Sequence, residues 1–177
     1  MTLNADRLVT ALHAPARYEP LSDPLDLFGR FVGAWDLEWH GTGNDGHDVV
    51  VRGELSFGWV LDGRAVQDVW RVPVDPADAL RMRAFHGTTV RFYDPAIGAW
   101  RSTWLDPLNG RVRRFIGRRA PSGDIVLEGL DDDPRERWSF REISHDRFRW
   151  VGEASSDGGR TWVVTDEMRA RRRAAAS

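Results

Sequence analysis

Several charged residues in this 177-residue chain lie in segments where apolar and polar residues alternate, so each of them faces either an interior or solvent. Asp68 alternates in phase with Val66 and Trp70. If that face is the inner one, burial favours the neutral carboxyl, and Asp68 becomes a candidate general acid or base. If the face with Gln67 and Val69 is the inner one, Asp68 is solvated and has no such role.

Two arginines are candidates for binding an anionic group. Arg91 alternates in phase with Tyr93. Arg114 alternates in phase with Ile116. An inward guanidinium would bind a carboxylate or phosphate through two N–H groups. The alternative for both is an outward position in surface ion pairs, which contribute little to stability.

Histidine, cysteine and lysine set further limits on the chemistry. None of the five histidines has the spacing of a local metal motif. His86 is in a predicted strand and His145 in a loop. They are the candidate haem ligands, and His86 is also a weak catalytic candidate beside Asp68. The absence of cysteine excludes thiolate chemistry, and the absence of lysine excludes Schiff-base and P-loop lysines.

Nine tryptophans are more than a core of this size ordinarily needs, so some are expected to line a cavity. The alternative for any one of them is core filling. With Asp68, His86, Arg91 and Arg114, the predicted ligand-binding residues are Trp39, Trp59, Trp70, Trp100 and Trp104.

Short alternating segments separated by turn residues must position these side chains. Helices are expected at 3–14 and 24–31, the second with Asp23 as its N-cap. Strands are expected at about 35–40, 49–59, 64–72, 81–93, 100–104, 111–119, 124–130, 135–143, 147–153 and 160–170. No helices alternate with the strands, so we predict an all-β fold. Closure hides the sheet edges, which favours an antiparallel up-and-down barrel of about eight to ten strands with short N-terminal helices.

The expected organisation is a single folded domain with extensions. Residues 1–23 form an N-terminal extension, whose helix at 3–14 covers the barrel mouth or packs on a partner subunit. Residues 24–171 form the barrel. Residues 172–177 form a flexible tail, because the chain ends in an arginine-rich and then alanine-rich run.

The segment FVGAWDLEWHGTG resembles the G-x-W signature that opens lipocalin-type barrels. The segments GWVLDGRAVQDVW, RFYDPAIGAWRSTW, GRVRRFIGRR and SDGGRTWVVTDEMRARR resemble an uncharacterised bacterial family of calycin-like (lipocalin and fatty-acid-binding-protein-like) domains. The similarity covers about residues 28–173. It implies the barrel fold and assigns no activity.

The resemblance also implies a structural pair at one end of the barrel. The tryptophan of the first strand, here Trp35, is covered by an arginine of the last strand. Arg169 is the expected partner and Arg171 the second choice. Such a cation–π contact contributes roughly 0.5–2 kcal/mol.

Charge and hydropathy restrict the partners. The net charge of −2 gives no basic footprint for nucleic acid. No apolar run reaches the length of a membrane span, and the N-terminus lacks the features of a signal peptide, so a cytoplasmic location is expected. A homodimer is left open.

The favoured function is binding of a small, largely apolar or aromatic molecule inside the barrel. The first alternative is a cavity enzyme of isomerase or cyclase type that uses an inward Asp or His. A nitrobindin-like haem protein is another, with haem the one cofactor considered. The last is a protein-interaction domain with a filled barrel and no ligand cavity.

Overall fold

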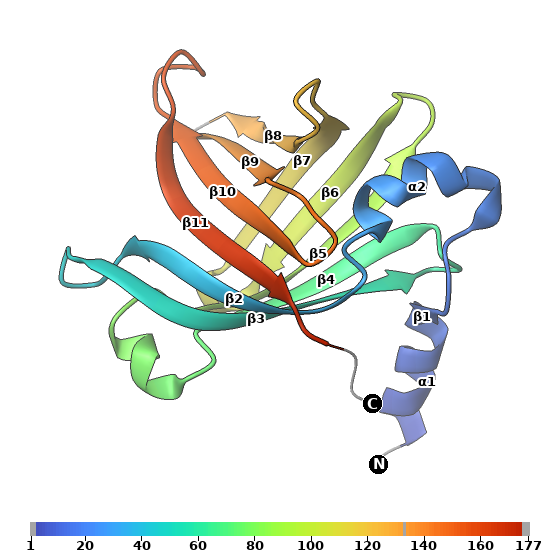
Figure 1. The fold of residues 1–177 in the computed structure, drawn as a ribbon, viewed down its shortest axis with the longest axis horizontal. Coiled ribbons are helices and arrows are strands. Elements are labelled where there is room, and N and C mark those ends of the chain that lie inside the picture. The colour runs from blue at the N-terminus through green and yellow to red at the C-terminus, as the bar shows by residue number, and fades with distance from the viewer. Residues whose placement is uncertain (1–2, 133, 175–177) are drawn as a thin grey trace.

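The computed structural model describes residues 3–132 and 134–174 of the chain (Figure 1). Its helices are α1 (Leu3–Leu12), α2 (Ser22–Gly29) and the 3-10 turns Glu19–Leu21, Pro76–Leu80 and Pro107–Asn109. Its strands are β1 (His13–Ala14), β2 (Gly33–Thr42), β3 (Asp48–Val60), β4 (Ala65–Val72), β5 (Phe85–Asp94), β6 (Ala99–Asp106), β7 (Arg111–Arg119), β8 (Ile125–Asp132), β9 (Arg135–Arg141), β10 (Arg147–Ser155) and β11 (Val163–Arg172). None of the helices in the described part is long and apolar enough to cross a membrane.

Strands β2 to β11 form a closed ring in which each strand is antiparallel to its neighbours. The ring closes where β11 pairs with β2, with Met168 opposite Trp39. The two residues of β1 pair with the end of β3. Full closure removes the free edges that an open sheet would expose. The predicted all-β, up-and-down antiparallel barrel is confirmed, and it has ten strands.

Helix α2 closes one end of the barrel (Figure 1). Its Leu25 and Phe28, and Phe31 just beyond it, are completely buried. Ring centroids of Phe28 and Trp100 are 4.8 Å apart, and those of Phe31 and Phe148 are 4.9 Å apart. Because these partners lie on different strands, the helix packs across the width of the barrel and fills that end with aromatic side chains.

Helix α1 does not cover the barrel mouth, contrary to one of the two roles considered for it. It lies outside the barrel beside β1 (Figure 1), and Leu8 and Val9 are 62% and 64% exposed. The expected strand at 81–93 begins at Phe85, because residues 76–80 form a 3-10 turn after Asp75, whose carboxylate accepts from the Ala77 N–H. Helix α2 begins one residue before Asp23, so this residue is not its N-cap.

The arginine over Trp35 is Arg172, which corrects the expectation of Arg169 or Arg171. The Arg172 guanidinium lies 4.1 Å from the Trp35 ring centroid. It also donates to the carbonyls of Arg30, Val32 and His145 at 2.6–2.7 Å. Arg169 is exposed and pairs with Glu167 on the outer face. Strand β11 ends at Arg172, which was expected in the flexible tail. Residues 175–177 of that expected tail lie outside the described part.

We expect Arg172→Met to lower the free energy of unfolding by about 2 kcal/mol, because three carbonyls lose a charged donor and the indole loses its cation. Arg169→Met is the matched control on the same strand. It should change stability by no more than about 0.5 kcal/mol, because its ion pair is exposed. Urea denaturation of both variants measures the difference. Equal effects would contradict the structural role of Arg172.

Candidate functional site

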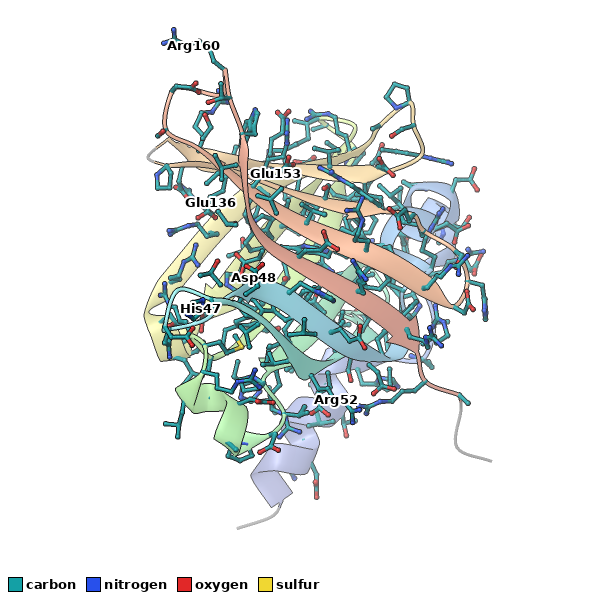
Figure 2. All side chains as sticks on the ribbon, turned by 60° about the vertical axis from the view of Figure 1, so that its left-hand side comes forward. His47, Asp48, Arg52, Glu136, Glu153 and Arg160 are labelled. Carbon is teal, nitrogen blue, oxygen red and sulfur yellow. The ribbon has the colours of Figure 1, made fainter. Side chains whose placement is uncertain are left out.

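A cavity of about 380 Å³ lies inside the barrel, between the end that α2 closes and the opposite end. Residues of the β2–β3, β6–β7 and β8–β9 turns lie at its mouth, among them Asn44, Asn109 and Pro134. Figure 2 shows Glu136 at the same end of the barrel as His47 of the β2–β3 turn. A volume of this size is within the range of small-molecule sites. The barrel is therefore not filled, which removes the main premise of the protein-interaction alternative.

The walls of the cavity are mainly indole rings. Five tryptophans line it: Trp39, Trp70, Trp104, Trp138 and Trp150. The ring of Trp138 lies 5.2 Å from that of Trp150 and 6.0 Å from that of Trp104, both in edge-to-face contact. Such contacts fix the rings against one another and form a rigid apolar wall.

Glycines lie behind three of these rings, among them Gly152 behind Trp150. Trp39 covers Gly41 on its own strand, and Trp104 covers Gly87 on the neighbouring strand. A methyl group at Gly41 or Gly87 would overlap the indole above it. The absence of a side chain therefore lets these two rings lie back against the wall and leaves the lumen open.

A buried ion pair lies near the closed end of the cavity. The Arg91 Nη2 donates to Asp68 Oδ2 at 2.6 Å, and the Thr89 N–H donates to Asp68 Oδ1 at 2.9 Å. The side chains of Asp68 and Arg91 are 0% and 2% exposed. The Arg91 guanidinium also lies 4.8 Å from the ring centroid of Phe28 of α2. Asp68 is thus inward, and both of its oxygens are engaged.

Arg91 lines the cavity and has donors left over. Its Nε and Nη1 are buried without a hydrogen-bond partner among the described residues. The hydroxyl of Ser102, directly opposite Arg91 on β6, is also buried and unpartnered. Buried N–H and O–H groups are almost always satisfied in folded proteins. This cluster at the inner end of the cavity is therefore suited to an anionic or acceptor group.

A second polar cluster lies toward the mouth. The Glu136 Oε1 accepts from Arg111 at 2.8 Å and from Arg113 at 3.1 Å. Asp106 accepts from the side-chain amide of Asn109 at 2.7 Å. The Glu136 Oε2 and the Asp106 Oδ1 are buried and have no partner in the described part of the chain. This end of the cavity therefore offers free acceptors, whereas the inner end offers free donors.

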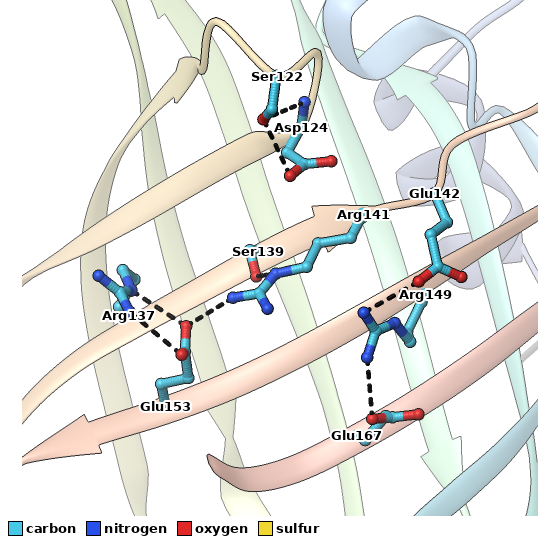
Figure 3. A network of polar contacts seen from close by, with 9 residues as sticks. All are labelled: Ser122, Asp124, Arg137, Ser139, Arg141, Glu142, Arg149, Glu153 and Glu167. Atoms are coloured by element: carbon cyan, nitrogen blue, oxygen red, sulfur yellow. Dashed lines mark hydrogen bonds and ion pairs between the residues drawn. The ribbon is translucent and has the colours of Figure 1, made fainter. Parts of the chain in front are cut away.

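The other arginines of β9 and β10 lie on the outer face, opposite in phase to Trp138 and Trp150. Figure 3 shows Glu153 between Arg137 and Arg141, with hydrogen bonds of 2.8–3.1 Å. Arg149 bridges Glu142 and Glu167 nearby. These networks tie adjacent strands together, and Glu153 also lines the cavity.

Four predicted site residues lie elsewhere. His86 is exposed, because the inner positions of β5 are those of Gly87, Thr89 and Arg91. Arg114 is also exposed and pairs with Asp131, because Phe115 takes the inner phase on β7.

Trp59 and Trp100 have the inner phase but lie at the closed end. Trp59 packs on Gly29 of α2, and Trp100 packs on Phe28, so neither lines the cavity. Of the predicted set, Trp39, Trp70, Arg91 and Trp104 line the cavity, with Asp68 behind Arg91.

Haem binding does not fit the residues at the cavity. All five histidines are described, and none is among the lining residues. The two candidate ligands, His86 and His145, are exposed outside the barrel. An axial histidine for a haem inside the cavity is therefore not available from either.

Sequence reasoning missed Trp138, Trp150, Asp106, Arg111 and Glu136 as site residues. Trp138 and Trp150 carried a usable signal, since each alternates in phase with a phenylalanine, Phe140 and Phe148. The polar residues at the mouth carried none, because charged residues near strand ends are ordinarily solvated.

No protein-family model matches the chain, and no curated protein matches it. Solved structures with a similar fold include two that cover most of the chain. The S-type phycobiliprotein lyase CPES from Guillardia theta has a TM-score of 0.55 and 12% identity over 85% of this chain and 93% of its own. Rv2717c from M. tuberculosis has a TM-score of 0.60 and 15% identity over 86% of this chain and 98% of its own. At these identities the likeness concerns the barrel fold alone.

Proposed function

We propose that this protein binds a small, largely apolar or aromatic molecule that carries an anionic group. The apolar body lies between the indoles of the barrel, and the anionic group accepts hydrogen bonds from Arg91. The observation that carries the proposal is a pair of buried donors, Nε and Nη1 of Arg91, which have no partner in the described part of the chain and belong to a residue that lines an aromatic-walled cavity.

Physical chemistry supports this pairing of features. An apolar ligand gains free energy from burial against indole rings, roughly 25 cal/mol for each Å² removed from water. A charge-assisted hydrogen bond then fixes the orientation of the ligand. A phycobiliprotein lyase among the proteins of similar fold agrees with a small-molecule role for such a barrel.

The enzyme alternative has less support from the site. Asp68 is held by Arg91 and the Thr89 N–H, and it does not line the cavity itself. His86 is outside. A general acid or base needs to reach the substrate directly or through one water, and neither candidate meets this condition. Neither residue that the sequence offered for catalysis therefore supports the enzyme alternative, and we favour binding.

Native mass spectrometry of the purified protein under gentle desolvation is the direct test, because a retained ligand appears as a mass excess. A titration with anilinonaphthalene sulfonate, an anionic aromatic dye, tests the site whether or not a ligand is retained. We expect the double variant Asp68→Leu/Arg91→Met to bind this dye about ten- to a hundredfold more weakly than the wild type. The double substitution avoids leaving one charge buried alone.

The matched control is phenylnaphthylamine, a neutral dye of similar shape. Its affinity should change only slightly between the wild type and the double variant, because its binding depends on the indole walls. If the double variant binds the anionic dye as tightly as the wild type does, Arg91 is not the anion site. If the wild type binds neither dye and retains no ligand, the proposed function is wrong.

A further inference from the structure

We propose that the ligand is polar at both ends: its anionic group binds Arg91, and an N–H or O–H group at its other end donates to Asp106 near the mouth. This inference rests on the proposed function, because it adds a second contact to the same cavity. It narrows the ligand class from an apolar anion to an elongated molecule with a distal hydrogen-bond donor.

Asp106 is a buried acceptor in the wall of the cavity. It is the last residue of β6, lines the cavity and is only 3% exposed. Its Oδ1 is buried and has no hydrogen-bond partner in the described part of the chain. Among the described residues its other oxygen, Oδ2, accepts a side-chain hydrogen bond from Asn109 alone. Leaving a buried acceptor unsatisfied costs about 1–3 kcal/mol or more, so a donor from the ligand would relieve a real penalty.

The orientation of Asp106 is fixed by its neighbours. The Asn109 side-chain amide donates to Asp106 Oδ2 at 2.7 Å and to the Ala84 carbonyl at 3.0 Å. The Arg83 Nε donates to Asn109 Oδ1 at 2.6 Å, which fixes which end of the amide faces Asp106. Because Asn109 holds Oδ2, the free Oδ1 cannot be satisfied by rotating the carboxylate without losing this bond. The site is therefore built before any ligand arrives.

Glu136 adds to the acceptor character of this end. Its Oε1 is shared by Arg111 and Arg113, while its Oε2 is buried and has no partner among the described residues. Arg111, which donates to Glu136, is directly opposite Asp106 on the neighbouring strand, and all three residues line the cavity. Both free oxygens therefore belong to one acceptor region near the mouth.

The spacing of the two ends gives the length of the ligand. Arg91 is directly opposite Ser102 on β6, and Asp106 is four residues farther along that strand. At about 3.3 Å per residue, the two positions are roughly 13 Å apart along the strand. The inward residue between them is Trp104, whose ring lines the cavity. A fitting ligand is thus anionic at one end, apolar across Trp104 and donating at the other end.

A pair of probes that differ only at the distal end tests this inference. Decanoate and ω-hydroxydecanoate share the carboxylate and the chain, and only the second carries a distal O–H. Their dissociation constants are measured by displacement of anilinonaphthalene sulfonate. We expect the wild type to bind the hydroxy acid about tenfold more tightly than decanoate, since only the hydroxy acid satisfies Asp106.

The variant Asp106→Asn should abolish this preference. The amide would turn its oxygen toward Asn109 and its NH₂ toward the cavity, which replaces the free acceptor by a donor. Decanoate should bind the variant at least as tightly as it binds the wild type, so a general loss of structure is distinguishable from loss of the contact. Asp131→Asn is the matched control, because Asp131 is an exposed acid that pairs with Arg114 outside the cavity. It should leave the preference unchanged.

The outcomes separate this inference from the proposed function. If both acids displace the dye and the wild type does not distinguish them, or if Asp106→Asn keeps the preference, the contact with Asp106 is refuted while anion binding stands. If the dye binds but neither acid displaces it, the two-ended ligand is likewise refuted. If the dye itself does not bind the wild type, the proposed function fails first.

Discussion

Asp68→Asn is expected to lower the free energy of unfolding by about 3–5 kcal/mol, although the substitution barely changes the shape of the side chain. The variant leaves Arg91 as a buried cation with no counter-charge, since the carboxylate is the only ion-pair partner of Arg91 within the described residues. The low exposure of both side chains means that water cannot compensate for the loss. Urea denaturation at neutral pH measures the effect.

The control is the double variant Asp68→Leu/Arg91→Met, which removes both charges together. Replacing a buried ion pair by apolar residues is often neutral or stabilising, so the double variant should be more stable than Asp68→Asn. An anionic dye supplies a second check. Excess anilinonaphthalene sulfonate should stabilise Asp68→Asn more than it stabilises the wild type, because the unneutralised Arg91 binds the sulfonate more tightly. A loss below about 1 kcal/mol in Asp68→Asn would contradict the account of the buried pair.

Phe28→Ala is the second substitution with a large expected effect, a loss of about 3–5 kcal/mol. Phe28 is fully buried and contacts Trp100, Phe140 and the guanidinium of Arg91. Removing its ring leaves a void between α2 and the barrel, directly beside the buried ion pair. We therefore expect a lower melting temperature together with weaker binding of the anionic dye, because water reaches Arg91 from the closed end.

Two variants control this prediction. Phe28→Leu keeps most of the buried volume and should cost about 1.5 kcal/mol or less. Leu108→Ala removes an apolar side chain that is 64% exposed in the β6–β7 turn, and it should change stability by about 0.5 kcal/mol at most. If Phe28→Ala were no worse than Leu108→Ala, α2 would not be the seal of the closed end.

The fold was accessible from the sequence because alternation and turn residues mark each strand separately. Asp62-Gly63 and Asn109-Gly110 separate successive strands as expected, and the glycines have the left-handed backbone that such turns require. The alternation of β4 also placed Asp68 with Trp70, and both proved to be inward. These features are local, and local patterns suffice to predict them.

Which residues of a strand face inward was harder to predict where apolar residues lie on both faces of the strand. On β7 the alternation of Val112 and Ile116 made Arg114 a candidate for an inward position, but Phe115 takes the inner phase and Val112 is 54% exposed. A shift of one residue reverses every side chain of a strand. Strand phase also explains why Arg172 covers Trp35. Arg172 alternates in phase with the buried Met168 and Ala170, whereas Arg169 and Arg171 have the opposite phase.

The position of the cavity along the barrel axis could not be predicted from alternation at all. Alternation indicates which side chains point inward. By this criterion Trp59, Trp100 and Trp104 are all inward and cannot be told apart. Only Trp104 lines the cavity, because α2 fills the end where the other two lie. How far a helix from another part of the chain enters the barrel depends on tertiary packing, which no local pattern records.

The glycines behind the cavity tryptophans have a consequence for how such a barrel changes its ligand. The width of the lumen at Trp39 depends on Gly41, a residue that lies behind the ring and whose added side chain would meet the indole alone. A single methyl group there would push the indole inward, so the size limit for a ligand is encoded at a position that the ligand does not touch. Substitution of a glycine behind a cavity tryptophan can therefore change which ligands fit the barrel, although no residue that contacts the ligand is replaced.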